Sequence, residues 1–521
     1  MQNLTWWKHA VVYQIYPRSF QDSNGDGIGD VNGILSRLDY LANLGIDSIW
    51  ISPIYPSPMA DFGYDVADYC GIDHIFGTME DFDQLLVEVH RRGLRLILDF
   101  VPNHTSDQHP WFLESRSSRV NPKRNWYIWR DQPNNWQSHF GRSAWEFDHT
   151  TGQYYLHEFL KEQPDLNWRN PAVKAAMFDT LRFWLNKGVD GFRVDVMWLV
   201  IKDDLFRDNP PNPTYKVGQG SRESLLPVYD ADRPEIHELV AEMRSVLEDF
   251  GDRVLIGEIY LPVPRLMDYY GPQLRGAHLP FNFQLLQCPW TAYDLAHAID
   301  HYLRALPAGA WPNWVLGNHD KSRIASRIGL AKARAAALLL LSLPGTLTIY
   351  YGEELGMQDV PIRPDQAQDP AERRQPGIGM GRDPERTPMP WDDSLQCGFT
   401  TNQPWLPVGE ANRAVNMRSS IQQLDSMLAL YRRLLALRRA QPVLVSGQLS
   451  EISSGGGVLQ FVRSDSNKKF RVAINLAEAA RSIPMKRGLI SGCTSLCREG
   501  ELTGNTLSLE CAEGVILEEF P

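Results

Sequence analysis

Cysteine and long apolar runs are scarce in this 521-residue sequence. No C-x-x-C pair and no Cys/His spacing typical of a zinc site is present, so we expect the cysteines to be buried thiols. The most apolar stretch, residues 335–352, is interrupted by Pro344 and Gly345. It is shorter than the roughly 20 residues that a membrane span needs, which disfavours a membrane protein. The cysteines are Cys70, Cys288, Cys397, Cys493, Cys497 and Cys511.

Two further features are missing: a secretory signal and a block of basic residues. The N-terminal sequence MQNLTWWKHAVVYQ has no basic start followed by an apolar region, which favours the cytoplasm. The chain carries 52 Lys and Arg against 63 Asp and Glu, a formal net charge of −11. Phosphate backbones would be repelled by this balance, so we expect no nucleic-acid partner.

The chain does contain a regular alternation of short β-rich runs and amphipathic helical patterns. Apolar, non-alternating strands between helices are typical of a parallel sheet covered by helices, and eight such strands close a TIM barrel. The predicted fold is therefore α/β, a (β/α)8 barrel. The expected strands are residues 11–17, 47–55, 94–101, 189–196, 254–258, 277–281, 314–320 and 346–352, with helices such as 34–45, 79–93, 171–188 and 234–250.

Three segments interrupt this alternation, and each follows a predicted strand. Residues 102–169 are too long for a βα loop and are rich in Trp, Asn and Pro, which predicts a small inserted domain after strand 3. Irregular stretches at 201–233 and 356–418 also lie at the face where barrel enzymes bind substrate. After residue 442 the pattern changes to short alternating strands. We expect a catalytic barrel at 1–101 and 170–442 and a C-terminal antiparallel β-sandwich at 443–521.

Ionisable residues end several of the predicted strands. A carboxylate at the end of an apolar barrel strand points to the barrel mouth, where substrates bind. One such Asp could equally cap a helix or pair with an arginine, whereas several on one face indicate a catalytic site. These residues are Asp65, Asp99, His104, Asp195, Glu258, His319 and Asp320.

Cleavage of a glycosidic bond by water is one reaction that such a site can perform without a metal or redox group. It needs a carboxylic acid to protonate the leaving oxygen and a carboxylate to attack or stabilise the sugar cation. Arg193, two residues before Asp195 on the same strand face, would keep Asp195 ionised. The apolar neighbours of Glu258 would raise its pKa, as a general acid requires.

Seven motifs in a fixed order give a resemblance to a known family: YQIYPRSF, GYDVADY, DFVPNHTS, QPDLNW, GFRVDV, GE and GNHD. They resemble the signature regions of the α-amylase superfamily, glycoside hydrolase family thirteen, over essentially the whole chain. QPDLNW, DFGYDV and GRDPERTPMPW resemble its α-glucosidase and oligo-1,6-glucosidase branch. The resemblance implies that Asp195 is the nucleophile, Glu258 the acid/base and Asp320 the stabiliser of the transition state, with retention of configuration.

The resemblance also implies a glucose subsite and a closed pocket. It places Asp65, His104, Arg193 and His319 around the sugar, with Tyr64 stacked beneath the ring. Asp61 and Arg386 resemble an ion pair that closes the pocket at the non-reducing end, which implies exo action. Residues of the inserted domain are candidates for the wall near the leaving sugar, and its tryptophans for stacking on sugar: Phe140, Phe159 and Gln163, and Trp126, Trp129, Trp136 and Trp145.

The segment DSNGDGIGD places oxygen atoms at alternate positions. Hard cations take six to eight oxygen ligands, and this pattern is similar to an EF-hand loop without its flanking helices. A turn of Asx and Gly residues without a metal is the alternative. Relatives carry a cation on the matching loop, so we expect a structural Ca²⁺ or Mg²⁺ on Asp22, Asn24, Asp26, the Ile28 carbonyl and Asp30.

The expected activity is an exo-acting α-glucosidase that releases glucose from small α-glucosides such as maltose, isomaltose and short oligosaccharides. In relatives, Val after the nucleophile accompanies α-1,6 activity, and Val196 is present here. The following Met197 and Trp198 resemble a bacterial α-glucosidase subgroup instead, which favours α-1,4 linkages. Alternatives are an oligo-1,6-glucosidase, a glucosyl transferase or isomerase of the same family, and a non-catalytic barrel.

Overall fold

The fold is described by a computed structural model that covers residues 5–495, 498, 500–502 and 504–520. Its central sheet has eight strands, as predicted, in the order β10-β11-β1-β2-β3-β7-β8-β9 with parallel pairing. The (β/α)8 fold class is therefore confirmed. The strands are β1 (Val11–Ile15), β2 (Ser48–Ile51), β3 (Arg95–Phe100), β7 (Gly191–Val194), β8 (Val254–Gly257), β9 (Leu279–Pro280), β10 (Asn313–Val315) and β11 (Thr346–Tyr350).

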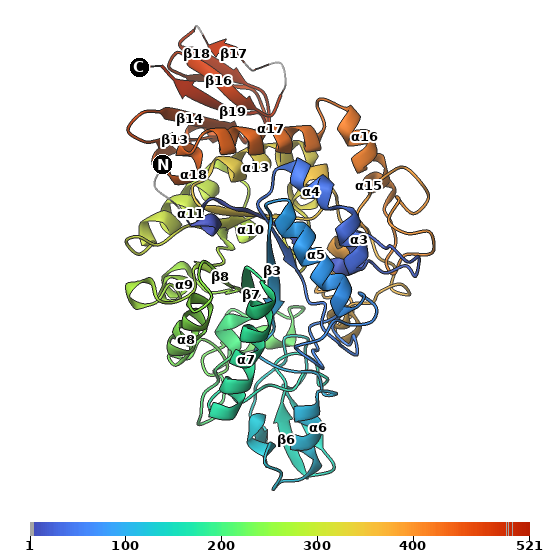
Figure 1. The fold of residues 1–521 in the computed structure, drawn as a ribbon. Coiled ribbons are helices and arrows are strands. Elements are labelled where there is room, and N and C mark those ends of the chain that lie inside the picture. Colours follow the sequence, from blue (N-terminus) through green and yellow to red (C-terminus); the bar gives the residue numbers. More distant parts are fainter. Residues whose placement is uncertain (1–4, 496–497, 499, 503, 521) are drawn as a thin grey trace.

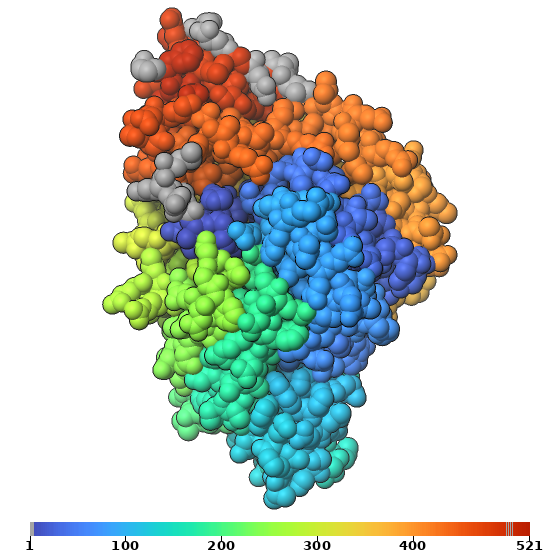
Figure 2. All heavy atoms as spheres, in the orientation of Figure 1, coloured from blue at the N-terminus to red at the C-terminus, as the bar shows by residue number. Residues whose placement is uncertain are grey.

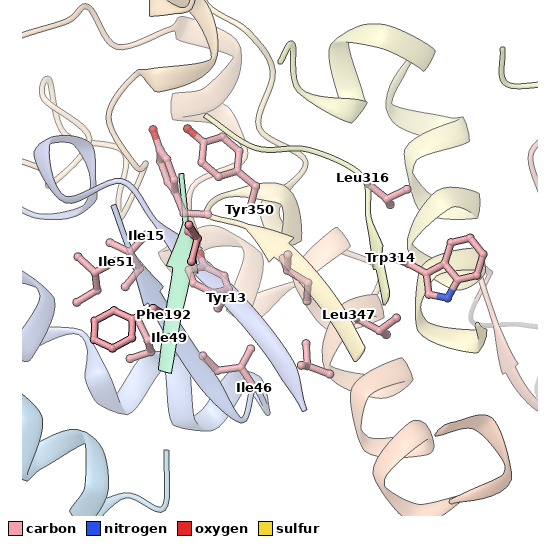
Figure 3. Close-up of a cluster of buried hydrophobic side chains, with 14 of the residues drawn as sticks. Tyr13, Ile15, Ile46, Ile49, Ile51, Phe192, Trp314, Leu316, Leu347 and Tyr350 are labelled. Atoms are coloured by element: carbon pink, nitrogen blue, oxygen red, sulfur yellow. The ribbon is translucent and has the colours of Figure 1, made fainter. Parts of the chain in front are cut away.

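Alternate residues of these strands form two separate apolar clusters. Successive side chains of a strand point to opposite faces, so one set fills the barrel and the other packs under the helices. Val12, Trp50, Ile97, Ile256 and Val315 belong to one cluster. The other cluster contains the side chains drawn in Figure 3, among them Tyr13, Ile49, Phe192, Trp314 and Leu347. The residues that continue the first set toward the strand ends are polar: Gln14, Asp99, Arg193, Asp195 and Glu258.

Helices surround the sheet, and their ends follow local sequence signals. Thr78 and Asp81 form a capping box at the start of α5, and Gly45 and Gly188 take the left-handed cap position after α4 and α7. The helices of the barrel are α1 (Trp6–His9), α2 (Pro17–Phe20), α3 (Val31–Ser36), α4 (Leu38–Leu44), α5 (Met79–Arg91), α7 (Pro171–Lys187), α8 (Ile236–Glu248), α9 (Val263–Asp268), α10 (Gln284–Gln287), α11 (Ala292–Ala305), α12 (Ile324–Ile328), α13 (Leu330–Ser342) and α17 (Met427–Ala440).

The barrel closes through a side chain where two strands do not pair. Within the described ranges, no ladder joins β9 to β10. Asn313 bridges them instead: its Nδ2 donates to the Pro280 carbonyl at 2.7 Å, and its Oδ1 accepts from the Asn282 backbone N–H at 3.0 Å. A single buried amide thus pairs with two backbone groups at the gap between β9 and β10.

The segment 102–169 contains α6 (Pro110–Ser117) and a three-stranded antiparallel sheet in the order β4-β6-β5. Its strands are β4 (Trp129–Arg130), β5 (Trp145–Asp148) and β6 (Gln153–Leu156). It forms one end of the molecule in Figures 1 and 2. Trp136 and Trp145 stack in its own small core at 6.2 Å, and Trp129 lies parallel to Phe112 at 5.8 Å.

The two irregular stretches contain short elements. A 3-10 turn (Ser221–Ser224) lies in the segment that follows β7. The segment that follows β11 contains α14 (Pro370–Arg374), a 3-10 turn (Asp383–Arg386), α15 (Glu410–Ala414) and α16 (Met417–Gln422).

The C-terminal part is a β-sandwich at the opposite end of the molecule (Figure 1). A six-stranded antiparallel sheet, β12-β13-β14-β19-β16-β17, faces the pair β15-β18 over a core that includes Ile483, Leu507 and Val515. The elements are α18 (Val443–Ser446), β12 (Gln448–Ser453), β13 (Val458–Ser464), β14 (Lys469–Asn475), β15 (Arg481–Pro484), β16 (Gly488–Cys493), β17 (Gly500–Leu502), β18 (Thr506–Leu509) and β19 (Gly514–Glu519).

The cysteines within the described residues form no disulfide, and Cys497 lies outside those residues. Burial raises the pKa of the Cys70, Cys288 and Cys397 thiols to about 11. In the part of the chain that the structure describes, no helix has both the length and the apolarity that crossing a membrane requires.

Candidate active site

Arg193 stands at the centre of the barrel mouth and binds three carboxylates. Its Nη1 donates to Asp99 Oδ1 and to Asp195 Oδ1, both at 2.8 Å, and its Nη2 lies 2.6 Å from Glu258 Oε2. The four side chains come from the ends of β3, β7 and β8, and all four are buried. Asp195 and Glu258 are therefore near neighbours, held on the two terminal nitrogens of one guanidinium.

The charges around Arg193 do not balance, and this affects protonation. Burial raises the pKa of Asp195, Glu258 and Asp99, and Arg193 opposes the shift. Neighbouring carboxylates raise the pKa of Asp195 and Glu258 further. One guanidinium cannot neutralise three buried carboxylates, so the cluster retains a proton above the usual range of a carboxyl group. The sequence predicted that Arg193 would keep Asp195 ionised. Arg193 binds Glu258 as well, so it does not separate the two roles.

The backbone after Asp195 supplies a second contact to Glu258. The Val196 N–H donates to Glu258 Oε2 at 2.9 Å. Val196 has φ 37° and ψ 46°, in the left-handed region that a β-branched residue rarely adopts. Such strain costs on the order of 1–3 kcal/mol and is retained at functional sites. The turn thus fixes the orientation of the Glu258 carboxyl group relative to Asp195.

A chain of hydrogen bonds crosses the mouth from β1 to β3. Burial keeps the pKa of His319 well below its usual value, so the ring is neutral. Gln14 Nε2 lies 2.7 Å from His319 Nδ1, and Tyr64 Oη lies 2.7 Å from His319 Nε2. Gln14 therefore donates to Nδ1, Nε2–H donates to Tyr64, and the Tyr64 hydroxyl donates to Asp99 Oδ2 at 3.1 Å. The Tyr64 and His319 rings stack at 5.4 Å.

Two arginines from the segment after β11 hold Asp320. Arg386 Nη2 donates to Asp320 Oδ1 at 2.9 Å, and Arg382 Nη1 donates to the same oxygen at 3.3 Å. The two arginines lower the pKa of Asp320 below its usual range, against the effect of burial. Asp320 is therefore ionised while the Arg193 cluster retains a proton.

The prediction that Asp61 pairs with Arg386 is wrong, because Asp61 pairs with Arg382 instead. Arg382 Nη2 donates to Asp61 Oδ1 at 2.7 Å, and Arg382 Nε donates to Asp369 Oδ2 at 2.7 Å. Arg386 lies deeper, where its Nε donates to the His319 carbonyl at 2.7 Å. Both arginines lie within four residues in the sequence, and spacing alone could not distinguish them.

These groups surround a cavity of about 590 Å³. A cavity of this volume can hold a ligand the size of a short oligosaccharide. Asp195, Glu258 and Asp320 all line it, together with predicted residues of the barrel loops and of the inserted domain: Asp61, Tyr64, His104, Phe140, Phe159, Gln163 and His319. The cavity is the candidate active site.

Three predicted residues support the cavity without lining it. Arg193 lies behind Asp195 and Glu258, and Arg386 lies behind Asp320. Asp65 is buried, and its carboxylate accepts the backbone N–H groups of Ala60 and Asp61 at 2.8 and 2.9 Å. Asp65 thus positions Asp61. The four tryptophans Trp126, Trp129, Trp136 and Trp145 are not among the lining residues either, because they pack within the inserted segment.

The wall formed by the inserted segment contains aromatic side chains and an amide. Phe140 and Phe159 meet edge to face at 5.6 Å, and the Arg382 guanidinium lies 4.9 Å from the Phe140 ring centre. Gln163 Nε2 donates to Asp61 Oδ2 at 3.3 Å. His104, whose pKa burial lowers to about 4, lies 3.0 Å from the Tyr64 carbonyl. An apolar wall beside a few fixed polar groups is the usual composition of a ligand pocket.

A buried ion cluster that the sequence analysis missed ties two insertions together. Arg222 Nη1 donates to Glu158 Oε2 at 3.1 Å, and Arg222 Nη2 lies 2.9 Å from Asp230 Oδ2. Burial raises the pKa of Glu158 to about 8. The turn that follows β7 is thereby fixed over the cavity, which His139, Glu223 and Trp198 also line. No local motif marks this long-range pair.

The loop at residues 22–30 forms a compact turn. Asp22 accepts the backbone N–H groups of Asn24, Gly25 and Gly27, and Asp30 accepts those of Ser23 and Gly33. Among the residues with described positions, no group of three or more His, Cys, Asp or Glu side chains is arranged to hold a metal ion. All the expected ligand atoms of this loop are oxygens, which hard cations such as Ca²⁺ and Mg²⁺ prefer. The expected cation therefore stays a prediction.

The fold and the mouth together define a barrel enzyme with paired carboxylates at its strand ends, the arrangement that glycoside hydrolysis requires. The model of the alpha-amylase catalytic domain matches residues 14–447. The chain belongs to the alpha-amylase family.

Named relatives agree with this membership over nearly the whole chain. A probable alpha-glucosidase of Rhizobium meliloti is 43% identical and covers 92% of each chain. An oligo-1,6-glucosidase of Parageobacillus thermoglucosidasius is 40% identical over 91% of each. Among solved structures, an alpha-glucosyl transfer enzyme superposes with a TM-score of 0.94 at 36% identity, covering 99% of this chain and 100% of its own.

Proposed function

We propose that the protein is a retaining, exo-acting α-glucosidase that removes glucose from the non-reducing end of short α-glucosides, with α-1,4 linkages favoured. The observation that carries this proposal is the pair Asp195 and Glu258 on one guanidinium, in a cavity bordered by the Asp61–Arg382–Asp369 ion cluster. Retaining glycosidases use two carboxyl groups at short separation. The relatives named as α-glucosidases support the substrate class.

In the first step, protonated Glu258 donates its proton to the glycosidic oxygen while an Asp195 oxygen bonds to C1 and the leaving sugar departs. In the second step, water loses a proton to the Glu258 carboxylate and its oxygen displaces Asp195 from C1. Glu258 is again protonated, and glucose leaves with its original configuration. The raised pKa of Glu258 suits the first step, and ionised Asp320 stabilises the positive charge at the sugar ring.

The ion cluster at Asp61 supports exo action. Asp61 and Arg382 line the cavity, and their bonds to Asp369 and Gln163 fix both side chains. Charged groups in fixed positions hydrogen-bond strongly to the hydroxyls of a terminal sugar. An enzyme that holds the terminal sugar in this way would act from the non-reducing end.

Glucose release from maltose and from isomaltose at equal concentration tests the linkage. We expect maltose to be the better substrate on the same enzyme preparation. A preference for isomaltose would make the protein an oligo-1,6-glucosidase, the activity named for several relatives, and Val196 the decisive residue. No glucose from either sugar would contradict the proposed function.

Glucosyl transfer to a second sugar is a second candidate. The solved structures titled as an alpha-glucosyl transfer enzyme and as the trehalulose synthase of Pseudomonas mesoacidophila favour it; the latter is 36% identical with a TM-score of 0.90. In this reaction a sugar hydroxyl replaces water in the second step. Product analysis at high sugar concentration separates the two reactions, because a dominant glucosylated or isomerised product would exclude simple hydrolysis.

We also propose that a Ca²⁺ or Mg²⁺ ion binds the loop of residues 22–30. The loop side chains Asp22, Asn24, Asp26 and Asp30, with the Ile28 carbonyl, would hold it. Such an ion would add stability to the fold, because the loop lies against residues 398–405 through the Thr400 hydroxyl, which donates to Asp22 Oδ2 at 2.5 Å. It takes no part in the chemistry proposed for Asp195 and Glu258.

A further inference from the structure

A second cavity lies at the N-terminal ends of the strands, the side of the barrel away from the active site. It has a volume of about 270 Å³. His278 directly precedes β9, and Trp311 lies two residues before β10, so the cavity lies where these two strands lack a ladder. Its lining includes Trp7, Lys8, Arg244, Tyr270, His278 and Trp311.

The polar side chains of this cavity are hydrogen-bond donors. His278 Nδ1 accepts the Leu255 backbone N–H at 3.0 Å, which leaves Nε2–H to donate. The Tyr270 hydroxyl already donates to the Trp311 carbonyl at 2.8 Å. The Lys8 ammonium and the Arg244 guanidinium are further side-chain donors of the cavity.

The charge of the cavity is positive, although the whole chain carries −11. Among the lining residues in the described ranges there is no Asp or Glu. Lys8 has no carboxylate partner in the described part of the chain. Among the described residues, Arg244 forms an ion pair with Glu248 on its own helix at 2.8 Å, and its Nη1 donates to the Gly276 carbonyl at 3.1 Å. Burial keeps the pKa of His278 well below its usual value, and both cations lower it further. Such a pocket attracts an anion.

Two indole rings in the cavity present their faces to the same cation. Lys8 Nζ lies 5.5 Å from the ring centre of Trp7 and 5.4 Å from that of Trp311. The Trp7 ring meets His278 edge to face at 4.8 Å, which fixes its orientation. Flat apolar faces beside a cation fit a ligand that joins a ring to a negative group.

We propose that this cavity binds a monosaccharide phosphate. The phosphate would accept from Lys8, Arg244 and His278, and the C–H face of the sugar ring would lie against Trp7 or Trp311. Inorganic phosphate lacks the ring that the indoles would contact. A free hexose lacks the charge that Lys8 and Arg244 would neutralise. The assignment is independent of the reaction at Asp195, because none of these side chains lines the active-site cavity.

Calorimetric titration of the full chain with glucose 6-phosphate tests this proposal. The titration uses the Asp195→Asn protein saturated with maltose, so that the active site is already occupied. We expect glucose 6-phosphate to bind at least about tenfold more tightly than inorganic phosphate or glucose, the gain expected from combining charge-assisted hydrogen bonds with a stacked ring. In the Lys8→Met/Arg244→Gln variant we expect the affinity for glucose 6-phosphate to fall by about tenfold or more.

The control is Arg304→Gln on α11, because Arg304 also pairs with a carboxylate four residues away, Asp300, but lies outside the cavity. This variant should bind as the parent does. Lys8→Met alone, which leaves α8 intact, repeats the test if the double variant does not fold. Equal binding of inorganic phosphate or of glucose would overturn the proposed ligand class. Absence of binding, or undiminished binding in the Lys8 variants, would overturn the site.

Discussion

Two acidic regions of the molecule, the barrel mouth and the loop of residues 22–30, use their carboxylates differently. In the mouth, Asp195 and Glu258 share the guanidinium of Arg193, Asp320 binds Arg386 from the segment after β11, and all three carboxylates line a cavity. In the loop, Asp22 and Asp30 accept backbone N–H groups from within eight residues. The loop carboxylates stabilise their own turn.

The difference shows what makes a carboxylate chemically useful. A carboxyl group whose neighbours are other buried acids and one guanidinium has a displaced pKa, as at Glu258. A carboxylate that accepts several N–H groups holds a local structure. The mouth therefore supports a reaction, whereas the loop supports a turn and, if the proposed cation binds, a metal site.

The largest expected effect is that of Asp195→Asn. This change keeps the volume but removes the nucleophile, so kcat for maltose should fall by at least about 10⁴-fold. The melting temperature should not fall, because a crowded buried charge is removed. The matched control is Asp26→Asn in the loop, which should leave kcat nearly unchanged. If Asp195→Asn kept a tenth of the wild-type activity, the nucleophile assignment would be wrong.

The pH dependence of the reaction tests Glu258. A raised pKa means that Glu258 keeps its proton at pH values where an ordinary carboxyl group has lost it, and the reaction needs that proton. The rate should fall as pH rises through the pKa of Glu258, and fall at low pH as Asp195 becomes protonated. Glu258→Gln should lower kcat/KM by about 10²–10⁴-fold and remove the alkaline limb. If the Glu258→Gln variant kept the alkaline limb unchanged, that limb would belong to another ionisable group.

Two arginines four residues apart should give different kinetic defects. Arg382 binds Asp61 at the edge of the cavity, and Arg386 binds Asp320 from behind. Arg382→Gln should raise KM for maltose by about tenfold, the value of one charge-assisted hydrogen bond, with a smaller change in kcat. Arg386→Gln should mainly lower kcat. The reverse pattern would restore the pairing of Asp61 with Arg386 that the sequence predicted.

The smallest expected effect on activity is that of Asp22→Asn. This change weakens acceptance of the three N–H groups, so the free energy of unfolding should fall by about 1–3 kcal/mol while kcat is nearly constant. Chelator should lower the melting temperature of the wild type, and added Ca²⁺ should restore it. The Asp22→Asn variant should show a smaller response to chelator. Identical melting of the wild type with and without chelator would contradict a removable cation.

The sequence predicted the barrel and the carboxylates at its mouth because both depend on repeated local patterns. Each strand is a short apolar run, and period-two alternation places Asp99, Arg193, Asp195 and Glu258 on the inner face. Contacts between distant loops leave no such pattern. For this reason the sequence predicted the wrong partner for Asp61 and did not predict the Arg222–Glu158 pair.

The inserted segment shows the same limit for aromatic residues. Tryptophan content predicted stacking surfaces at the mouth, but the rings of Trp136 and Trp145 bury one another. Composition indicates how much apolar surface is present, and packing decides which part of that surface remains exposed to the cavity. Phe140 and Phe159, which do line the cavity, were identified from the family resemblance.

The most direct test of the central claim is the anomeric form of the first glucose released, followed by proton NMR during the first minutes of maltose hydrolysis. Double displacement at Asp195 and Glu258 predicts that α-glucose forms first and then equilibrates with the β-anomer. Initial release of β-glucose would mean a single displacement by water and would contradict the account of the barrel mouth.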